Sequence, residues 1–140
     1  MPSVYTRIIA GELPARFVWA DERCVAFLSN RPLRPGHTLV VSRLEVDHWL
    51  DLNPELLGHL MGVSHRLGQA LQHGFHPLKV GMIIAGLEVP HVHIHLVPIH
   101  SLGHLDFAQQ DWNPRPEDMD RAAETIRASL ATLGLAPDGP

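Results

Sequence analysis

Residues 91–98, His-Val-His-Ile-His-Leu-Val-Pro, place three histidines at alternate positions in an otherwise apolar run. Strict alternation over this length is typical of a β-strand. Successive side chains of a strand point to opposite faces, so we expect His91, His93 and His95 to share one face, with neighbouring Cα atoms about 6.5–7 Å apart. Burying a histidine costs free energy unless its ring is hydrogen-bonded. Three such residues in one strand therefore indicate a functional site more than ordinary packing.

Two kinds of site fit this spacing. Alternate histidines on a strand suit zinc or another transition metal, because imidazole is a common ligand of these ions. The same arrangement suits a nucleophilic histidine whose two neighbours orient it and donate hydrogen bonds to an anion. The local spacing does not separate these two interpretations.

Length and charge limit the possible functions. A chain of 140 residues favours one domain. Its formal net charge of -4 predicts no general attraction to nucleic acid or to an anionic membrane, so a phosphate site has to be built locally. The single cysteine, Cys24, lies in an apolar run and is expected to pack as a small hydrophobe. With no signal-peptide pattern and no apolar run of membrane-spanning length, we expect a cytoplasmic location.

Hydrophobic periodicity and helix-stop signals predict an α+β fold with a mainly antiparallel sheet, one long helix and a C-terminal helix. The long helix is expected to begin after Asn53, a good N-cap, and to end at Gly74. We expect residues 1–112 to form the main domain, residues 113–140 to pack on it as a helical extension, and the last five residues to fray. The expected helices span residues 3–10 (ending at Gly11), 54–73 and 117–133 (followed by Gly134), and the expected strands span residues 16–20, 24–29, 37–41, 78–84 and 91–97, the last two paired antiparallel.

Four segments, and their order along the chain, resemble the histidine triad (HIT) family of nucleotide hydrolases and transferases. Residues 91–97 match the family's triad pattern, His-φ-His-φ-His-φ-φ with φ apolar, in full. The other segments are Ile-Ile-Ala-Gly-Glu-Leu-Pro at 8–14, Asp-Glu-Arg-Cys-Val-Ala-Phe-Leu at 21–28 and Pro-Gly-His-Thr-Leu-Val-Val at 35–41. The resemblance covers about residues 3–99 and leaves the C-terminal helix outside the common pattern.

The resemblance implies a HIT-like fold, a homodimer with a continuous sheet, and one purine nucleotide site in each subunit without a cofactor. By analogy, His93 attacks the α-phosphorus of a nucleoside phosphoramidate or dinucleoside polyphosphate, and water then releases the nucleotide from His93. His91 and His95 would hydrogen-bond phosphate oxygens or fix the tautomer of His93, and His37 matches a further histidine of the family. The positions that match the family's base-binding residues are Val4, Tyr5, Ile8, Phe27 and Leu39.

Several positions depart from the family pattern at the expected substrate site. Ser29 stands where an aspartate commonly binds the ribose, and Ala85 lies in the region that commonly supplies an asparagine. In the shortened loop that begins at Gly86, Leu87 replaces the usual glutamine and Glu88 replaces a hydroxyl residue. An ionised Glu88 about 4 Å from a phosphate charge would be repelled by about 4 kcal/mol at an effective dielectric constant of 20.

Three interpretations of Glu88 are open: a protonated general acid, a partner for a cationic group, or a solvated side chain without a role. The departures make a nucleotide-binding protein with weak hydrolysis the second hypothesis for the chain, and a histidine-based metalloprotein the third. Some family members hold a structural zinc ion with a Cys-x-x-Cys pair and a later histidine. The matching residues here are Ser3, Thr6 and Glu45, so we predict no structural zinc ion and no metal among the site residues.

Overall fold

The sheet has five strands in the order β1-β2-β3-β5-β4, and every neighbouring pair is antiparallel. A computed structural model describes residues 1–137. Its α+β architecture confirms the fold class expected from the sequence. Of the five C-terminal residues expected to fray, 138–140 lie outside the described residues. The strands are β1 Phe17–Ala20, β2 Cys24–Leu28, β3 Thr38–Ser42, β4 Lys79–Ile83 and β5 His93–Ile99; the helices are α1 Val4–Ile9, α2 Pro54–Phe75 and α3 Pro116–Thr132, with 3-10 turns at Trp49–Asp51, Leu102–Leu105 and Phe107–Gln109.

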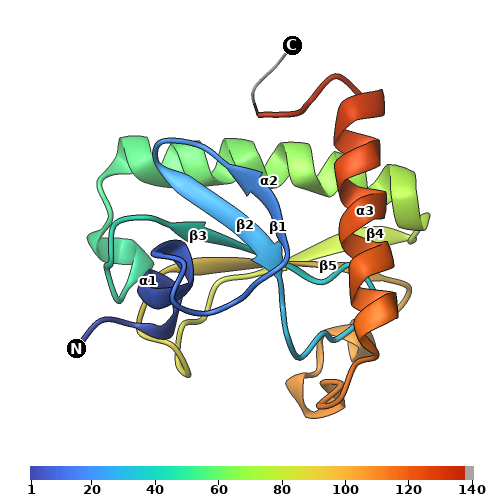
Figure 1. The fold of residues 1–140 in the computed structure, drawn as a ribbon, viewed down its shortest axis with the longest axis horizontal. Coiled ribbons are helices and arrows are strands. Elements are labelled where there is room, and N and C mark those ends of the chain that lie inside the picture. The colour runs from blue at the N-terminus through green and yellow to red at the C-terminus, as the bar shows by residue number, and fades with distance from the viewer. Residues whose placement is uncertain (138–140) are drawn as a thin grey trace.

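The two faces of the sheet carry different layers. Helix α2 runs along one face and shares a core with α3, and α1 lies on the other face (Figure 1). Alternation along the strands separates the layers. Ala26, Val40 and Ile94 pack toward α2, whereas Phe27 and Leu39 pack with residues of α1. The histidines at 93 and 95 alternate with Ile94, so the sequence pattern directs them away from α2.

Local signals predict the helix starts well, and one predicted helix end is wrong. The Asn53 Oδ1 atom accepts a hydrogen bond from the Leu56 N–H at 2.7 Å, as expected of an N-cap. Helix α2 does not end at Gly74 but continues to Phe75, and His76 adopts the left-handed conformation, with φ 52°. A Cβ atom at Gly74 would lie 2.6 Å from the Thr125 methyl carbon on α3. Glycine at this position therefore allows two helices to approach closely.

Strand β5 begins two residues later than the alternation predicts. The His91 N–H donates to the carbonyl of Val89 and the Val92 N–H to that of Val46, both at 2.8 Å, so these residues precede the ladder. The strand then continues through Pro98. Proline has no N–H to donate, but it is tolerated here because pairing with β3 ends at Leu96 and only β4 lies beside Pro98. The expected antiparallel pairing of β4 with the histidine strand is confirmed.

Helix α3 joins the C-terminal segment to the rest of the described chain. Its apolar side contributes Ile126 and Leu130 to the core shared with α2. The Arg127 guanidinium donates to the Phe17 carbonyl at 2.7 and 3.0 Å, and Arg16 pairs with Asp120 at 2.7 Å. The two arginine contacts hold α3 against β1 and the residue that precedes it. Within residues 1–137, no helix combines the length and the apolar character needed to cross a bilayer.

Candidate functional site

A cavity of about 910 Å³ opens on the face of the sheet that carries α1. Its size is within the range of small-molecule sites in proteins. His37, His93 and His95 line this cavity, whereas His91 does not. The positions expected to bind substrate all line it as well: Val4, Tyr5, Ile8, Phe27, Ser29, Leu39, Gly86, Leu87 and Glu88.

His93 is held in one tautomer by the main chain. Its Nδ1 atom lies 2.8 Å from the carbonyl oxygen of His91. A carbonyl oxygen only accepts, so the ring proton is on Nδ1 and the lone pair is on Nε2. Burial lowers the pKa of His93 and outweighs the hydrogen bond to the His91 carbonyl, which raises it. The ring is therefore neutral at pH 7, with Nε2 available as a nucleophile.

A second chain of hydrogen bonds fixes the proton of His95. The Leu33 N–H donates to His37 Nδ1 at 2.9 Å, and His37 Nε2 lies 2.9 Å from His95 Nδ1. Burial lowers the pKa of His37 to about 4 and that of His95 to about 3, so both rings are neutral. Because His37 accepts at Nδ1, its proton is on Nε2 and is donated to His95. The remaining proton of His95 is then on Nε2, where it can be donated to an anion.

His91 occupies a different environment from the other two triad residues. It is fully buried; its Nε2 donates to the Ser42 carbonyl at 2.6 Å, and its Nδ1 accepts from the Ser3 hydroxyl at 2.6 Å. Both nitrogens are thus engaged by the protein, and the three triad rings do not converge on a common point. This geometry disfavours a metal ion held by all three. His91 instead joins α1 to the end of β3 and orients His93 through its main-chain carbonyl.

The residues at the family's structural zinc positions form a hydrogen-bonded cluster beside His91. The Glu45 Oε1 atom accepts from the Ser3 N–H at 2.8 Å and from the Thr6 hydroxyl at 2.5 Å. These bonds, the Ser3 N–H first, lower the pKa of Glu45. Structural zinc sites are built from cysteine, histidine and carboxylate ligands, and two of the groups here are hydroxyls that already have protein partners. The donor set does not fit a structural zinc ion.

The apolar part of the cavity adjoins the histidines. The Tyr5 ring packs edge-on against Phe27 at 5.6 Å between centroids and against His93 at 4.9 Å. Burial, and then the charge of Glu88, raise the pKa of Tyr5 to about 12. Gly86 adopts φ +75°, a conformation that favours glycine, and begins the loop that carries Glu88. This loop forms an exposed rim, with Leu87 94% exposed.

The cavity also contains residues that the sequence pattern does not predict. The Phe107 ring packs edge-on against His95 at 5.0 Å. Met119 and Asp120 line the cavity from α3, which has no counterpart in the pattern used for the resemblance. Arg31 also lines the cavity, and its guanidinium stacks on the Trp112 ring at 4.1 Å. The position of Arg31, two residues after Ser29, is the sequence signal that could have identified it as a cavity residue.

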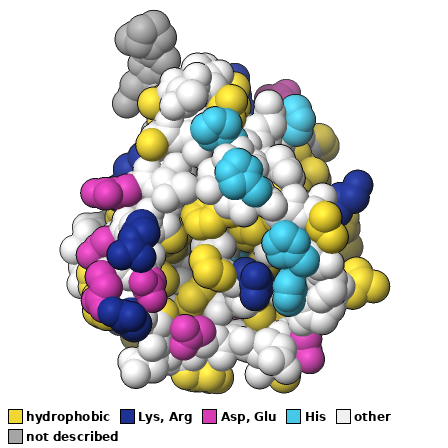
Figure 2. All heavy atoms as spheres, turned by 90° about the vertical axis from the view of Figure 1, so that its right-hand side faces the viewer, with side chains coloured by type: hydrophobic (Ala, Val, Ile, Leu, Met, Phe, Trp, Pro, Cys, Tyr) yellow, Lys and Arg dark blue, Asp and Glu magenta, His cyan; other side chains and the backbone are white. Residues whose placement is uncertain are grey.

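Two histidines that follow β5 pair with each other outside the cavity. His104 Nδ1 accepts from the His100 N–H at 3.0 Å, and neither residue lines the cavity. Figure 2 shows one face of the molecule on which several histidine side chains lie above and to the right of a hydrophobic group. The histidine-rich composition thus divides between a buried site and the surface.

Comparisons with known proteins give the family. The HIT domain matches residues 10–102. An uncharacterized HIT-like protein of Mycobacterium tuberculosis is 31% identical over 141 residues, covering 97% of this chain and 98% of that protein. The fold is similar to that of a zinc-bound histidine triad family protein from Mycobacterium smegmatis, with a TM-score of 0.80 and 28% identity over 93% of this chain and 94% of that one. A HIT family hydrolase from Legionella pneumophila has a TM-score of 0.61 and 27% identity, over 69% and 91% of the two chains. This chain belongs to the HIT family.

Proposed function

We propose that the protein is a nucleotide hydrolase that cleaves at the α-phosphate of a purine nucleoside phosphoramidate or dinucleoside polyphosphate. The observation that carries this proposal is the pair of fixed tautomers in the cavity. His93 presents an unprotonated Nε2, and His95 presents a protonated Nε2. Their ring centroids lie 4.8 Å apart, so a nucleophile and a hydrogen-bond donor stand side by side.

In this reaction the Nε2 atom of His93 forms a bond to the α-phosphorus, the bond from phosphorus to the leaving group breaks, and the leaving group takes a proton from water. The resulting nucleotidyl-imidazole is cationic, and its Nδ1–H remains bonded to the His91 carbonyl, which stabilises the charge. His95 donates its Nε2 proton in a hydrogen bond to a non-bridging phosphate oxygen. Water then adds to phosphorus, gives up a proton to solvent, and breaks the bond to Nε2, which releases the nucleoside monophosphate and restores neutral His93.

The apolar part of the cavity is the proposed base site. Phe27, Leu39 and the residues of α1 supply an apolar surface next to the histidines, as expected for a flat aromatic ligand. The ribose would lie near Ser29, whose hydroxyl already accepts from the Arg31 N–H at 3.3 Å. A hydroxyl gives the ribose a weaker acceptor than a carboxylate would, because charged acceptors make stronger hydrogen bonds.

We further propose a homodimer that joins two copies through β4. This strand is at the edge of the described sheet, and an unpaired edge is a template for pairing with another chain. Leu78 and Met82 are exposed at this edge.

The proposal also includes a cytoplasmic location. The free thiol of Cys24 is compatible with the reducing conditions of that compartment.

The test is release of AMP from adenosine 5′-phosphoramidate by purified protein, with His93→Ala and His100→Ala in parallel. We expect turnover by the parent and by His100→Ala, whose side chain lies outside the cavity, and none by His93→Ala. A short reaction stopped in alkali should also retain AMP on the parent protein, because phosphoramidates of histidine survive base. Full turnover by His93→Ala would contradict the nucleophile assignment.

A nucleotide-binding protein with weak hydrolysis is the alternative. It is favoured by the departures at Ala85, Leu87 and Glu88, where the asparagine, glutamine and hydroxyl residue common in the family are absent. Saturable binding of AMP without turnover of phosphoramidate, ADP or dinucleoside polyphosphate would support this alternative over the hydrolase.

A further inference from the structure

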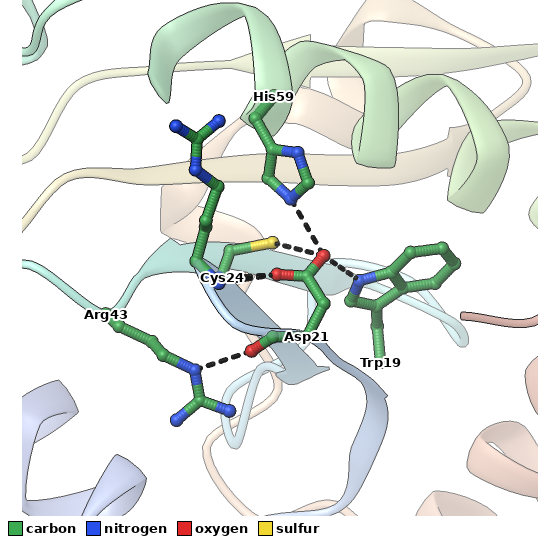
Figure 3. A network of polar contacts seen from close by, with 6 residues as sticks. Trp19, Asp21, Cys24, Arg43 and His59 are labelled. Atoms are coloured by element: carbon green, nitrogen blue, oxygen red, sulfur yellow. Dashed lines mark hydrogen bonds and ion pairs between the residues drawn. The ribbon is translucent and has the colours of Figure 1, made fainter. Parts of the chain in front are cut away.

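The turn between β1 and β2 carries a group of polar side chains on the face of the sheet opposite the cavity (Figure 3). Asp21 lies in the turn, Cys24 begins β2, and His59 extends from the second turn of α2. One potential ligand atom from each of these residues lies within 4.8 Å of the other two. None of the three has a role in the proposed hydrolysis.

The Asp21 carboxylate is oriented by the protein. Its Oδ1 atom accepts from the Arg23 and Cys24 N–H groups at 2.8 and 2.9 Å. Its Oδ2 atom is thereby turned toward His59 Nε2 at 2.8 Å and toward the Cys24 sulfur at 3.6 Å, and it also accepts from the Trp19 indole at 2.8 Å. Burial opposes ionisation of Asp21, but these donors, first the Trp19 indole, outweigh it and hold the pKa well below its usual range.

The geometry points to a site for one zinc-class divalent cation, bound by Asp21 Oδ2, Cys24 Sγ and His59 Nε2, with a fourth position left for water. Carboxylate, thiolate and imidazole are the three ligand types that zinc takes in proteins, at about 2.0–2.3 Å. Ligand atoms of a tetrahedral site with these bond lengths lie about 3.3–3.6 Å apart. The distance between Asp21 Oδ2 and Cys24 Sγ is already in this range. The distance between Asp21 Oδ2 and His59 Nε2 must increase by about 0.5 Å.

Access and charge are both compatible with a bound cation. The side chains of His59 and Asp21 are 31% and 22% exposed, which leaves a path from solvent, while Cys24 is buried behind them. Carboxylate and thiolate together neutralise a dication. Arg43 donates to the Asp21 main-chain carbonyl at 2.7 Å, and its charge favours the thiolate form of Cys24.

Binding requires a defined movement of protons. Burial, followed by the charge of Asp21, raises the pKa of Cys24, so the metal-free site holds a thiol. The cation replaces the thiol proton, which is released to solvent, and forms the metal–sulfur bond. His59 now donates its Nε2 proton to Asp21, and it must bind the metal as the tautomer protonated at Nδ1. The Trp19 indole keeps its hydrogen bond to the ligating carboxylate, a common outer contact of metal sites.

The preference for zinc over magnesium or calcium follows from the sulfur and nitrogen ligands. Thiolate and imidazole favour zinc and its neighbours among the transition metals, whereas magnesium and calcium take oxygen ligands. Cobalt(II) adopts the same sites as zinc and reports a bound thiolate through a charge-transfer absorption band. It is therefore the probe for the test.

The experiment is a cobalt(II) titration of tag-free, reduced protein, followed by competition with zinc(II). We expect one equivalent to bind with a thiolate charge-transfer band, and zinc to abolish the band. His59→Ala should weaken binding at least tenfold, and Cys24→Ala should remove the band. His65→Ala, on the exposed side of α2, and His93→Ala, in the cavity, should both bind cobalt as the parent does.

Each result decides the proposal. Absence of the thiolate band in the parent, or equal binding by His59→Ala, would overturn it. Loss of binding in His93→Ala would also overturn it, because the metal would then be in the cavity. Should Cys24→Ala fail to fold, His59→Ala and the zinc–sulfur distance in the parent, about 2.3 Å by X-ray absorption, still test the site. Turnover is not used here, so failure of the hydrolase proposal would leave this test unchanged.

Discussion

His37→Asn tests whether the buried, neutral histidines of the cavity make the fold sensitive to acid. His37 is 1% exposed, and burial lowers its pKa from 6.5 to about 4. Asparagine can keep the hydrogen bond from the Leu33 N–H through its side-chain oxygen, but it loses the bond from His37 Nε2 to His95. Because the lost hydrogen bond weakens the variant at both pH values, the difference between two pH values reports the proton-binding site at position 37.

The sign of the effect follows from proton binding in the two states. Between pH 6.5 and about 4 the unfolded chain binds a proton at His37 and the folded protein does not. The free energy of unfolding therefore falls as the pH falls through this window and is unaffected by His37 above it. For pKa values of 6.5 and about 4, the loss at pH 5 is about 2 kcal/mol. This is a large part of the 5–15 kcal/mol typical of a domain.

Urea unfolding at pH 7.5 and pH 5.0, followed by tryptophan fluorescence, measures the loss. The parent should lose about 2 kcal/mol more than His37→Asn between the two pH values. His65→Asn, at an exposed position on α2, should lose as much as the parent. An equal loss in the parent and in His37→Asn would refute the reasoning, because His37 would then bind protons alike in both states.

Two further predictions concern helix packing and the cavity rim. The Cβ atom of Gly74→Ala would clash with the Thr125 methyl. The Thr125 hydroxyl donates to the Arg121 carbonyl, which keeps the methyl in place. We therefore expect Gly74→Ala to lower the free energy of unfolding in urea by about 1–2 kcal/mol. In Gly62→Ala the added Cβ atom has nothing within 4 Å, so this variant should raise the free energy of unfolding by up to about 1 kcal/mol. A change of the same sign in both variants would contradict the packing argument. Glu88→Gln should lower the KM for an anionic substrate several-fold at low salt, and the difference should shrink as salt is added. Glu55→Gln, on α2 across the sheet, is the control, and an unchanged or raised KM for Glu88→Gln would exclude repulsion at the rim.

Features set by neighbouring residues were predictable from the sequence. Asn53 caps α2 because an N-cap bond needs only the next few residues. The strands β2 and β3 were also predicted, but they are buried along their whole length, so the family resemblance and not alternation brought Phe27 and Leu39 to the site. The end of α2 could not be predicted, because glycine at position 74 is required by the close approach of Thr125, which lies on a helix about fifty residues later in the chain. A glycine near a helix end carries the same local signal whether it stops the helix or admits a neighbour.

The hydrogen bond between His37 and His95 joins residues 58 positions apart, so no local pattern contains it. The family resemblance brought His37 to attention but did not give the direction of its proton. That direction depends on a main-chain donor, Leu33 N–H, whose position follows from the loop before β3. The tautomers in the cavity are thus a property of the assembled fold.

The triad itself shows how a regular sequence pattern can hide unlike environments. Alternation gives the period of a strand but not the residue at which its ladder begins. Here the ladder begins at His93, so His91 stands before it, and its ring reaches Ser3 and Ser42 while its carbonyl holds His93. A substitution at His91 that spares the main chain would disturb the anchoring of α1 before it disturbs the nucleophile. Stability should therefore respond most at His91 and turnover most at His93, although the sequence presents the two positions as equivalent.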